Sequence, residues 1–147
     1  MDIEVLKIQK RATKKVCSSE AVYKYASHIK DASREVMAVM LLDSKNGVLD
    51  FHIHSIGTVD SSAVYPREIV KQAILKDASG IILVHNHPSG DSEPSIPDKQ
   101  LTKDVVFGCR FLGLKLLDHL ILGNGNYYSF ADQGLIEQYE FDALHVV

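Results

Sequence analysis

Two histidines and an aspartate stand out in this sequence as side chains able to bind a metal ion together. His85 and His87 follow the apolar run 80–84, and Asp98 follows a loop rich in Pro, Ser, Gly, Asp and Glu. Side chains alternate along a β-strand, so a strand that ends in His85-x-His87 presents both imidazoles on one face. Two imidazole nitrogens and a carboxylate oxygen, brought back by the loop, predict a site for a divalent metal.

A set of three protein ligands favours one kind of chemistry. It leaves the fourth position of a tetrahedral zinc ion open, which is typical of catalytic rather than structural zinc. Zinc lowers the pKa of a bound water toward ~7, and a nearby acidic side chain can then accept the proton. The pattern therefore favours a catalytic zinc site that activates a water molecule.

Both parts of the pattern also have readings that need no metal. Residues 95–98 form an S-x-x-D capping box with proline in the first turn, in which Asp98 would bind the backbone N–H of Ser95. The two histidines could be polar residues at the end of a strand. Residue types and spacing alone leave these alternatives open.

The spacing of four residues resembles a known motif. His85-x-His87, seven residues, Ser95, two residues and Asp98 are similar to the JAMM motif of the JAB1/MPN+ metalloproteases. The resemblance implies an α/β fold with a mixed central β-sheet flanked by helices, related in architecture to the cytidine-deaminase-like fold. It also implies that His85, His87 and Asp98 bind zinc and that the protein hydrolyses a peptide, isopeptide or related amide bond.

Three segments are more particularly similar to the RadC-like branch of that family: HNHPSGD at 85–91, PREIV at 66–70 and LDHLILG at 117–123. The similarity covers roughly residues 20–140. An alternative from another class is a DNA-repair-associated or nucleic-acid-binding accessory protein with a non-proteolytic metal site. Tight, salt-sensitive DNA binding by the isolated chain would favour that alternative.

The resemblance also implies two catalytic roles. Glu35, at the head of the apolar run 36–42, matches the upstream glutamate of the motif and is expected to be the general base that activates water and then protonates the leaving group. Ser95 is expected to donate a hydrogen bond to the oxyanion of a tetrahedral intermediate. Position alone would make Glu35 a surface acid and Ser95 a helix cap.

The sequence departs from the RadC-like pattern in two places. Members usually carry an N-terminal helix–hairpin–helix segment, whereas about 18 residues precede the first expected helix here, so we expect a short form without it. Ser92 and Glu93 stand where the family more often has proline or similar residues, and the ligand spacing is unchanged. We expect residues 1–18 to be a basic arm, with its positive charges at Lys7, Lys10, Arg11, Lys14 and Lys15.

Hydrophobic periodicity predicts the elements that position these residues. The expected helices cover about 20–32, from Pro66, about 16 residues from Pro97, and about 132–139. The expected strands are 36–42, 48–58, 80–84, 114–122 and 127–130. Turn residues at 45–47 and 123–126 predict two hairpins. Strands interleaved with helices indicate a mixed sheet with its site after the third strand, at a βα junction.

Composition fits one domain, which we expect to span residues 19–147. The chain has 147 residues and a net charge of −3, which gives no support to DNA binding. Cys17 and Cys109 are far apart and in no paired motif, there is no signal-peptide pattern, and no apolar run could span a bilayer. These features predict a cytoplasmic protein with no membrane partner. They leave its peptide or protein substrate and its oligomeric state, including a homodimer, undetermined.

Three other histidine patterns are weaker. His52 and His54 share a strand face but lack a returning acid, so we expect them to face solvent. Asp118-His119 could support the site or face the substrate, although satisfied structural polar groups are the commoner case. Asn86 between two histidines is not an HNH nuclease motif, and the H-x-E and P-C-x-x-C patterns of zinc deaminases are absent.

Overall fold

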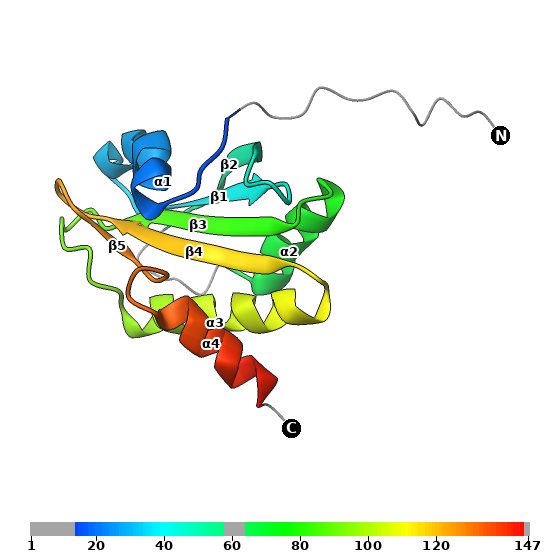
Figure 1. The fold of residues 1–147 in the computed structure, drawn as a ribbon. Coiled ribbons are helices and arrows are strands. Elements are labelled where there is room, and N and C mark those ends of the chain that lie inside the picture. Colours follow the sequence, from blue (N-terminus) through cyan, green and yellow to red (C-terminus); the bar gives the residue numbers. More distant parts are fainter. Residues whose placement is uncertain (1–13, 58–63, 146–147) are drawn as a thin grey trace.

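A five-stranded sheet lies between two layers of helix (Figure 1). The structure is a computed structural model that describes residues 14–57 and 64–145. The helices are α1 (Ser19–Ala26), the 3-10 helix η2 (Ser27–Asp31), α2 (Pro66–Leu75), α3 (Ile96–Phe111) and α4 (Leu135–Leu144). The strands are β1 (Val36–Leu42), β2 (Val48–Ile56), β3 (Gly80–Asn86), β4 (Lys115–Leu122) and β5 (Tyr127–Ser129). The predicted α/β fold with a mixed sheet flanked by helices is confirmed.

The strand order β2-β1-β3-β4-β5 places the site. Strands β3 and β4 are parallel and joined by helix α3, and the other neighbours are antiparallel. Because β1 runs antiparallel to β3, the beginning of β1 lies beside the end of β3, and Met37 pairs with His85. Residues just before β1 and just after β3 therefore meet at one edge of the sheet.

The core explains the continuous apolar runs of β1 and of residues 80–84 in β3. All seven residues of β1 and all seven of β3 are buried, because helices cover both faces of the sheet. Val39 packs with α2 and α3, whereas Met40 packs with α1. Figure 1 shows α1 on one side of the sheet and α3 and α4 on the other. Within the described residues, every helix is too short or too polar to cross a lipid bilayer.

Helix α3 begins and ends within one residue of the positions that its sequence predicts. Ser95 is the N-cap, a proline occupies the first turn, and the helix has 16 residues. Gly113 follows its end with a φ of 68°, a conformation that glycine adopts without strain. The rigid start of α3 is what carries Asp98.

The two terminal helices differ from the expected ranges. The helix expected at 20–32 is α-helical only to Ala26 and then tightens into η2. The C-terminal helix runs over Leu135–Leu144 rather than 132–139, because the carboxylate of Asp118 accepts a hydrogen bond from the Ala131 N–H and holds the preceding residues in turns.

The edge strand β2 also differs from expectation. Leu49 and Ile53 are 36% and 46% exposed, whereas His52 and His54 are half-buried. The side-chain pattern is interrupted because the pairing of β1 with β2 shifts between Met37 and Ala38, as a β-bulge does.

Part of the expected basic arm packs on the domain. Val16 is 4% exposed, in the same cluster as α1. Its N–H donates to the Asn46 carbonyl, and the Lys14 carbonyl accepts from the Val48 N–H. Residues 1–13 of the arm, and the serines at 61–62 expected before α2, lie outside the described residues.

Candidate metal centre

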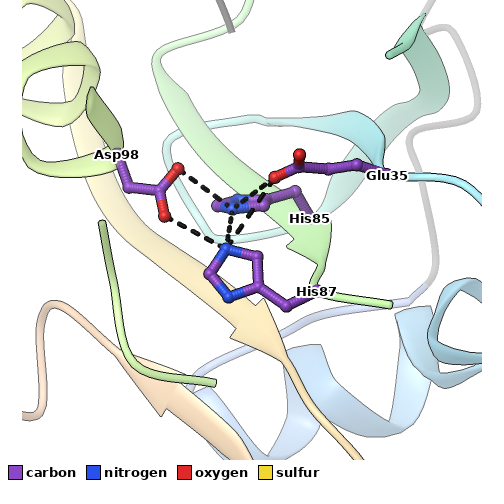
Figure 2. Close-up of side chains that lie close together, drawn as sticks. All are labelled: Glu35, His85, His87 and Asp98. Carbon is purple, nitrogen blue, oxygen red and sulfur yellow. Dashed lines mark hydrogen bonds and ion pairs between the residues drawn. The ribbon is translucent and has the colours of Figure 1, made fainter. Parts of the chain in front are cut away.

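Four side chains converge at the edge of the sheet where β1 begins and β3 ends. Figure 2 shows Glu35, His85, His87 and Asp98 pointing toward one another. One potential ligand atom from each lies within 4.8 Å of the others. Among the described residues, these four form the one group of three or more His, Cys, Asp or Glu side chains close enough together to hold an ion. The structure therefore brings together all three predicted ligands and the predicted general base.

The spacing of three of these side chains fits a tetrahedral ion. Ligand atoms ~2.0–2.1 Å from a tetrahedral zinc lie about 3.3 Å apart. The Nε2 atoms of His85 and His87 are 3.1 Å apart. The Asp98 Oδ1 is 3.3 Å from the first of them, and its Oδ2 is 3.1 Å from the second. Two nitrogens and a carboxylate are thus already at ligand-to-ligand distances.

Asp98 serves the helix cap and the cluster at the same time. Its Oδ2 accepts the Ser95 N–H at 2.9 Å, while the Ser95 Oγ accepts the Asp98 N–H at 3.1 Å. These are the two bonds of a capping box. The same carboxylate reaches both histidines, so the capping interpretation and the metal-ligand interpretation are compatible. The cap fixes the rotamer of Asp98 before any metal binds.

Hydrogen bonding fixes the tautomer of His87. Its Nδ1 lies 2.7 Å from the Asp91 carbonyl oxygen, which can only accept. Nδ1 therefore carries the proton, and Nε2 of the neutral ring has a free lone pair directed into the cluster. The loop between the histidines and Asp98 thus orients a ligand as well as returning the carboxylate.

A buried chain fixes the tautomer of His85 in the same way. The Thr102 hydroxyl donates to the Asp98 carbonyl at 2.6 Å, so it must accept from His119 Nδ1 at 2.7 Å. His119 Nε2 is then the acceptor for His85 Nδ1, 2.7 Å away. This leaves the Nε2 of His85 unprotonated. A proton or a metal ion between them would relieve the repulsion of two lone pairs 3.1 Å apart beside a carboxylate. Two imidazole nitrogens and a carboxylate are a donor set that fits zinc.

Without a metal, a proton on a histidine Nε2 atom can instead be shared with the carboxylate of Asp98. Burial by itself raises the pKa of Asp98, but hydrogen bonds from His85 and His87 outweigh it and hold that pKa well below its usual range. The hydrogen bond to Asp98 raises the pKa of His87. Burial, together with the nearby His85, lowers the pKa of His119 well below 6.5. His119 is therefore a neutral ring that relays hydrogen bonds.

Glu35 stands slightly apart from the other three. Its Oε1 is 3.5 Å from His85 Nε2 and 3.8 Å from His87 Nε2, and its side chain is 37% exposed. The three ligands are more deeply buried than Glu35. A carboxylate at the open side of the cluster can reach both solvent and a bound substrate.

The sequence alone left the supporting residues unassigned. The sequence did not decide whether His119 packs in the core or supports the metal site. Its ring is fully buried, stacks on Phe130 with the ring centroids 4.9 Å apart, and is hydrogen-bonded to His85. Asp118 instead accepts from the Ser129 hydroxyl and backbone N–H groups, which is a structural role. Thr102 carries no sequence signal that distinguishes it from an ordinary helix residue.

We expect His119→Phe to lower zinc affinity about 10- to 100-fold. Phenylalanine keeps a ring against Phe130 but removes the acceptor for His85 Nδ1. Competition with a chromophoric chelator measures the affinity. His119→Gln, which retains an acceptor, should give an intermediate value. Ser129→Ala is the control, because it removes a buried hydroxyl that takes no part in the hydrogen bonds from Thr102 through His119 to His85, and it should bind zinc normally. Normal zinc binding by His119→Phe would contradict the role of His119 in orienting His85.

Comparison with known proteins places these features in a family. The profile of the RadC-like JAB domain matches residues 16–135. UPF0758 proteins of Methanosarcina acetivorans and Symbiobacterium thermophilum are 40% and 43% identical to this chain, over 84% and 82% of it. The matched regions are 54% and 52% of those proteins. The chain thus spans about half the length of the curated relatives it matches.

Proposed function

This chain belongs to the RadC-like JAB domain family, and from that premise we propose that it is a zinc-dependent hydrolase of a peptide, isopeptide or related amide bond. The observation that carries the proposal is the convergence of the Nε2 atoms of His85 and His87, 3.1 Å apart, with the carboxylate of Asp98. Hydrogen bonds at Nδ1 that end on backbone carbonyls orient both rings with Nε2 toward this point. Such preorganisation serves a bound cation better than it serves packing.

Zinc is the metal that this donor set favours. Imidazole nitrogens and one carboxylate are typical ligands of catalytic zinc, and three protein ligands leave a position for substrate or water. His85, His87 and Asp98 would hold the ion. When bound, it would supply a Lewis acid that activates water at neutral pH.

Two other side chains would complete the reaction. Glu35 accepts the proton of the attacking water and returns it to the leaving amine, because its carboxylate faces the cluster and is partly open to solvent. The Ser95 Oγ accepts the Asp98 N–H, and its hydroxyl hydrogen remains able to donate to the substrate oxygen as negative charge develops there. The same loop and helix start would thus bind both metal and substrate.

We also propose a protein or peptide as the partner and the cytoplasm as the compartment. Cys17 and Cys109 are both free thiols, which is the usual state in a reducing environment. Burial raises the pKa of Cys109 to about 12, so this thiol is unreactive.

We expect hydrolysis to depend on zinc reversibly. The zinc-loaded protein is incubated with a mixed peptide library and with lysine isopeptides, and new termini are identified by mass spectrometry. Removal of the metal with a chelator should abolish the products, and adding about one equivalent of Zn²⁺ should restore them, whereas Ca²⁺ should not because the site offers imidazole ligands. Cleavage that persists at full rate in metal-free protein would refute the proposal.

A further inference from the structure

Asn86 lies between the two histidines but faces the opposite side of the strand. It is fully buried, and its side-chain amide makes three hydrogen bonds to a segment 50 to 54 residues earlier in the chain. Its Oδ1 accepts the Val36 N–H at 2.7 Å. Its Nδ2 donates to the Arg34 carbonyl at 3.0 Å and to the Ala32 carbonyl at 3.2 Å.

These contacts hold both peptide planes that flank Glu35. The Arg34 carbonyl belongs to the plane before the Glu35 Cα atom, and the Val36 N–H belongs to the plane after it. Two soft dihedrals separate the planes, so fixing both planes to one rigid amide fixes the backbone of Glu35. The Glu35 carbonyl also accepts the Gly57 N–H at 2.7 Å, which holds the second plane from its other side.

Only a side chain of this kind satisfies all three groups. An amide presents two donors and an acceptor at fixed separation, and here two carbonyls and one N–H face it. An aspartate would meet the two carbonyls with oxygen atoms, and an alanine would remove the partner of the buried Val36 N–H and of two part-buried carbonyls. The arrangement also has the correct amide orientation, because each amide atom faces a group of opposite hydrogen-bonding type.

We infer that Asn86 is a positioning residue that sets the place of the Glu35 carboxylate relative to the metal ligands. One strand end then determines the whole site, because His85 and His87 supply nitrogens on one face while Asn86 anchors the base from the other. The inference rests on the proposed function of Glu35 as general base. In this view Asn86 contacts neither metal nor substrate and acts only through Glu35.

The metal ligands themselves do not depend on this clamp. His85 is held by pairing of β3 with β1 and β4 and by its bond to His119. His87 is held by Asp91, and Asp98 by the capping box. Loss of the Asn86 amide should therefore move the base and leave zinc binding in place, which separates positioning of the base from general damage to the site.

The test compares Asn86→Ala with Val84→Ala. Val84 lies two residues earlier on β3, is fully buried on the same face and has no polar contact with the Glu35 segment, so its variant reports the effect of lost packing alone. Crystal structures give the distance from Glu35 Oε1 to His85 Nε2, which is 3.5 Å in the wild type. Zinc affinity, kcat and KM are measured on folded, zinc-loaded protein.

For Asn86→Ala we expect Glu35 displaced, kcat lowered about tenfold or more with KM little changed, and zinc affinity near that of the wild type. Val84→Ala should keep the wild-type distance and kcat. If Asn86→Ala is insoluble, Asn86→Asp preserves the volume and is measured identically. A folded variant with Glu35 in place, or one that loses zinc as much as it loses turnover, overturns the inference.

The crystallographic measurement does not need a substrate. If the zinc-loaded wild type hydrolyses nothing, the proposed function fails, and the position of Glu35 in the Asn86 variant still decides whether the clamp exists. If the wild type is active and the Asn86 variant is equally active, the clamp fails and the hydrolase remains.

Discussion

His85→Ala is expected to lower zinc affinity by about a hundredfold or more and to abolish zinc-dependent hydrolysis. Structural zinc sites are stabilised by ~10–16 kcal/mol shared among four ligands, so one ligand contributes about 3 kcal/mol, and 1.4 kcal/mol is a factor of ten. His85 is 1% exposed and lies within 3.3 Å of both other ligands.

Elemental analysis and chelator competition measure this loss. The wild type should hold about one zinc per chain, and Asp98→Ala should behave like His85→Ala, with additional destabilisation from the lost capping box. His52→Ala is the matched control, because His52 is a half-buried histidine bonded to Asp50, outside the cluster. Stoichiometric zinc with wild-type affinity in His85→Ala would remove the basis for the metal centre.

Glu35→Gln should retain zinc and lose about 10²- to 10⁴-fold in kcat, the usual contribution of general acid–base catalysis. Glutamine has nearly the same shape and can keep polar contact with the cluster, but its amide cannot accept the proton of a water molecule. Glu35 lies 3.5 Å from His85 and 3.8 Å from His87, which is near enough for it to act either as the base or as a fourth ligand. The variant distinguishes the two roles, because loss of a base leaves zinc bound whereas loss of a ligand weakens zinc binding.

Zinc content and kcat must therefore be measured on the same preparation. Retained zinc with lost turnover supports the base, whereas lost zinc assigns Glu35 to the ligands. Glu68→Gln is the control, since Glu68 is a partly exposed glutamate on α2 that pairs with Arg67 and should leave both quantities unchanged. Unaltered turnover in Glu35→Gln would exclude the proposed mechanism.

The sequence by itself determined the features that depend on residues close together in the chain. Strand β1 was predicted at its observed bounds, and helix α3 was predicted with its observed length, shifted by one residue, because strand burial and helix capping depend on neighbouring residues. His85, His87 and Asp98 could be grouped for the same reason, since one strand end and one loop carry all three. The helix expected at 132–139 was misplaced because a distant carboxylate, that of Asp118, holds the preceding turn.

The tertiary structure decided everything that needs two distant segments. Residue spacing made Glu35 an ordinary strand-end acid, and only the family resemblance pointed to it. Antiparallel pairing of β1 with β3 places it beside His85.

The same holds for the groups that make His85 a ligand and Glu35 a base. His119 comes from β4 and Thr102 from α3, while the Asn86 amide reaches back 50 residues to Val36. The direction of these hydrogen bonds sets which nitrogen of His85 holds the proton, and the Asn86 amide anchors the backbone that carries the Glu35 carboxylate. That direction exists only after these segments have packed together.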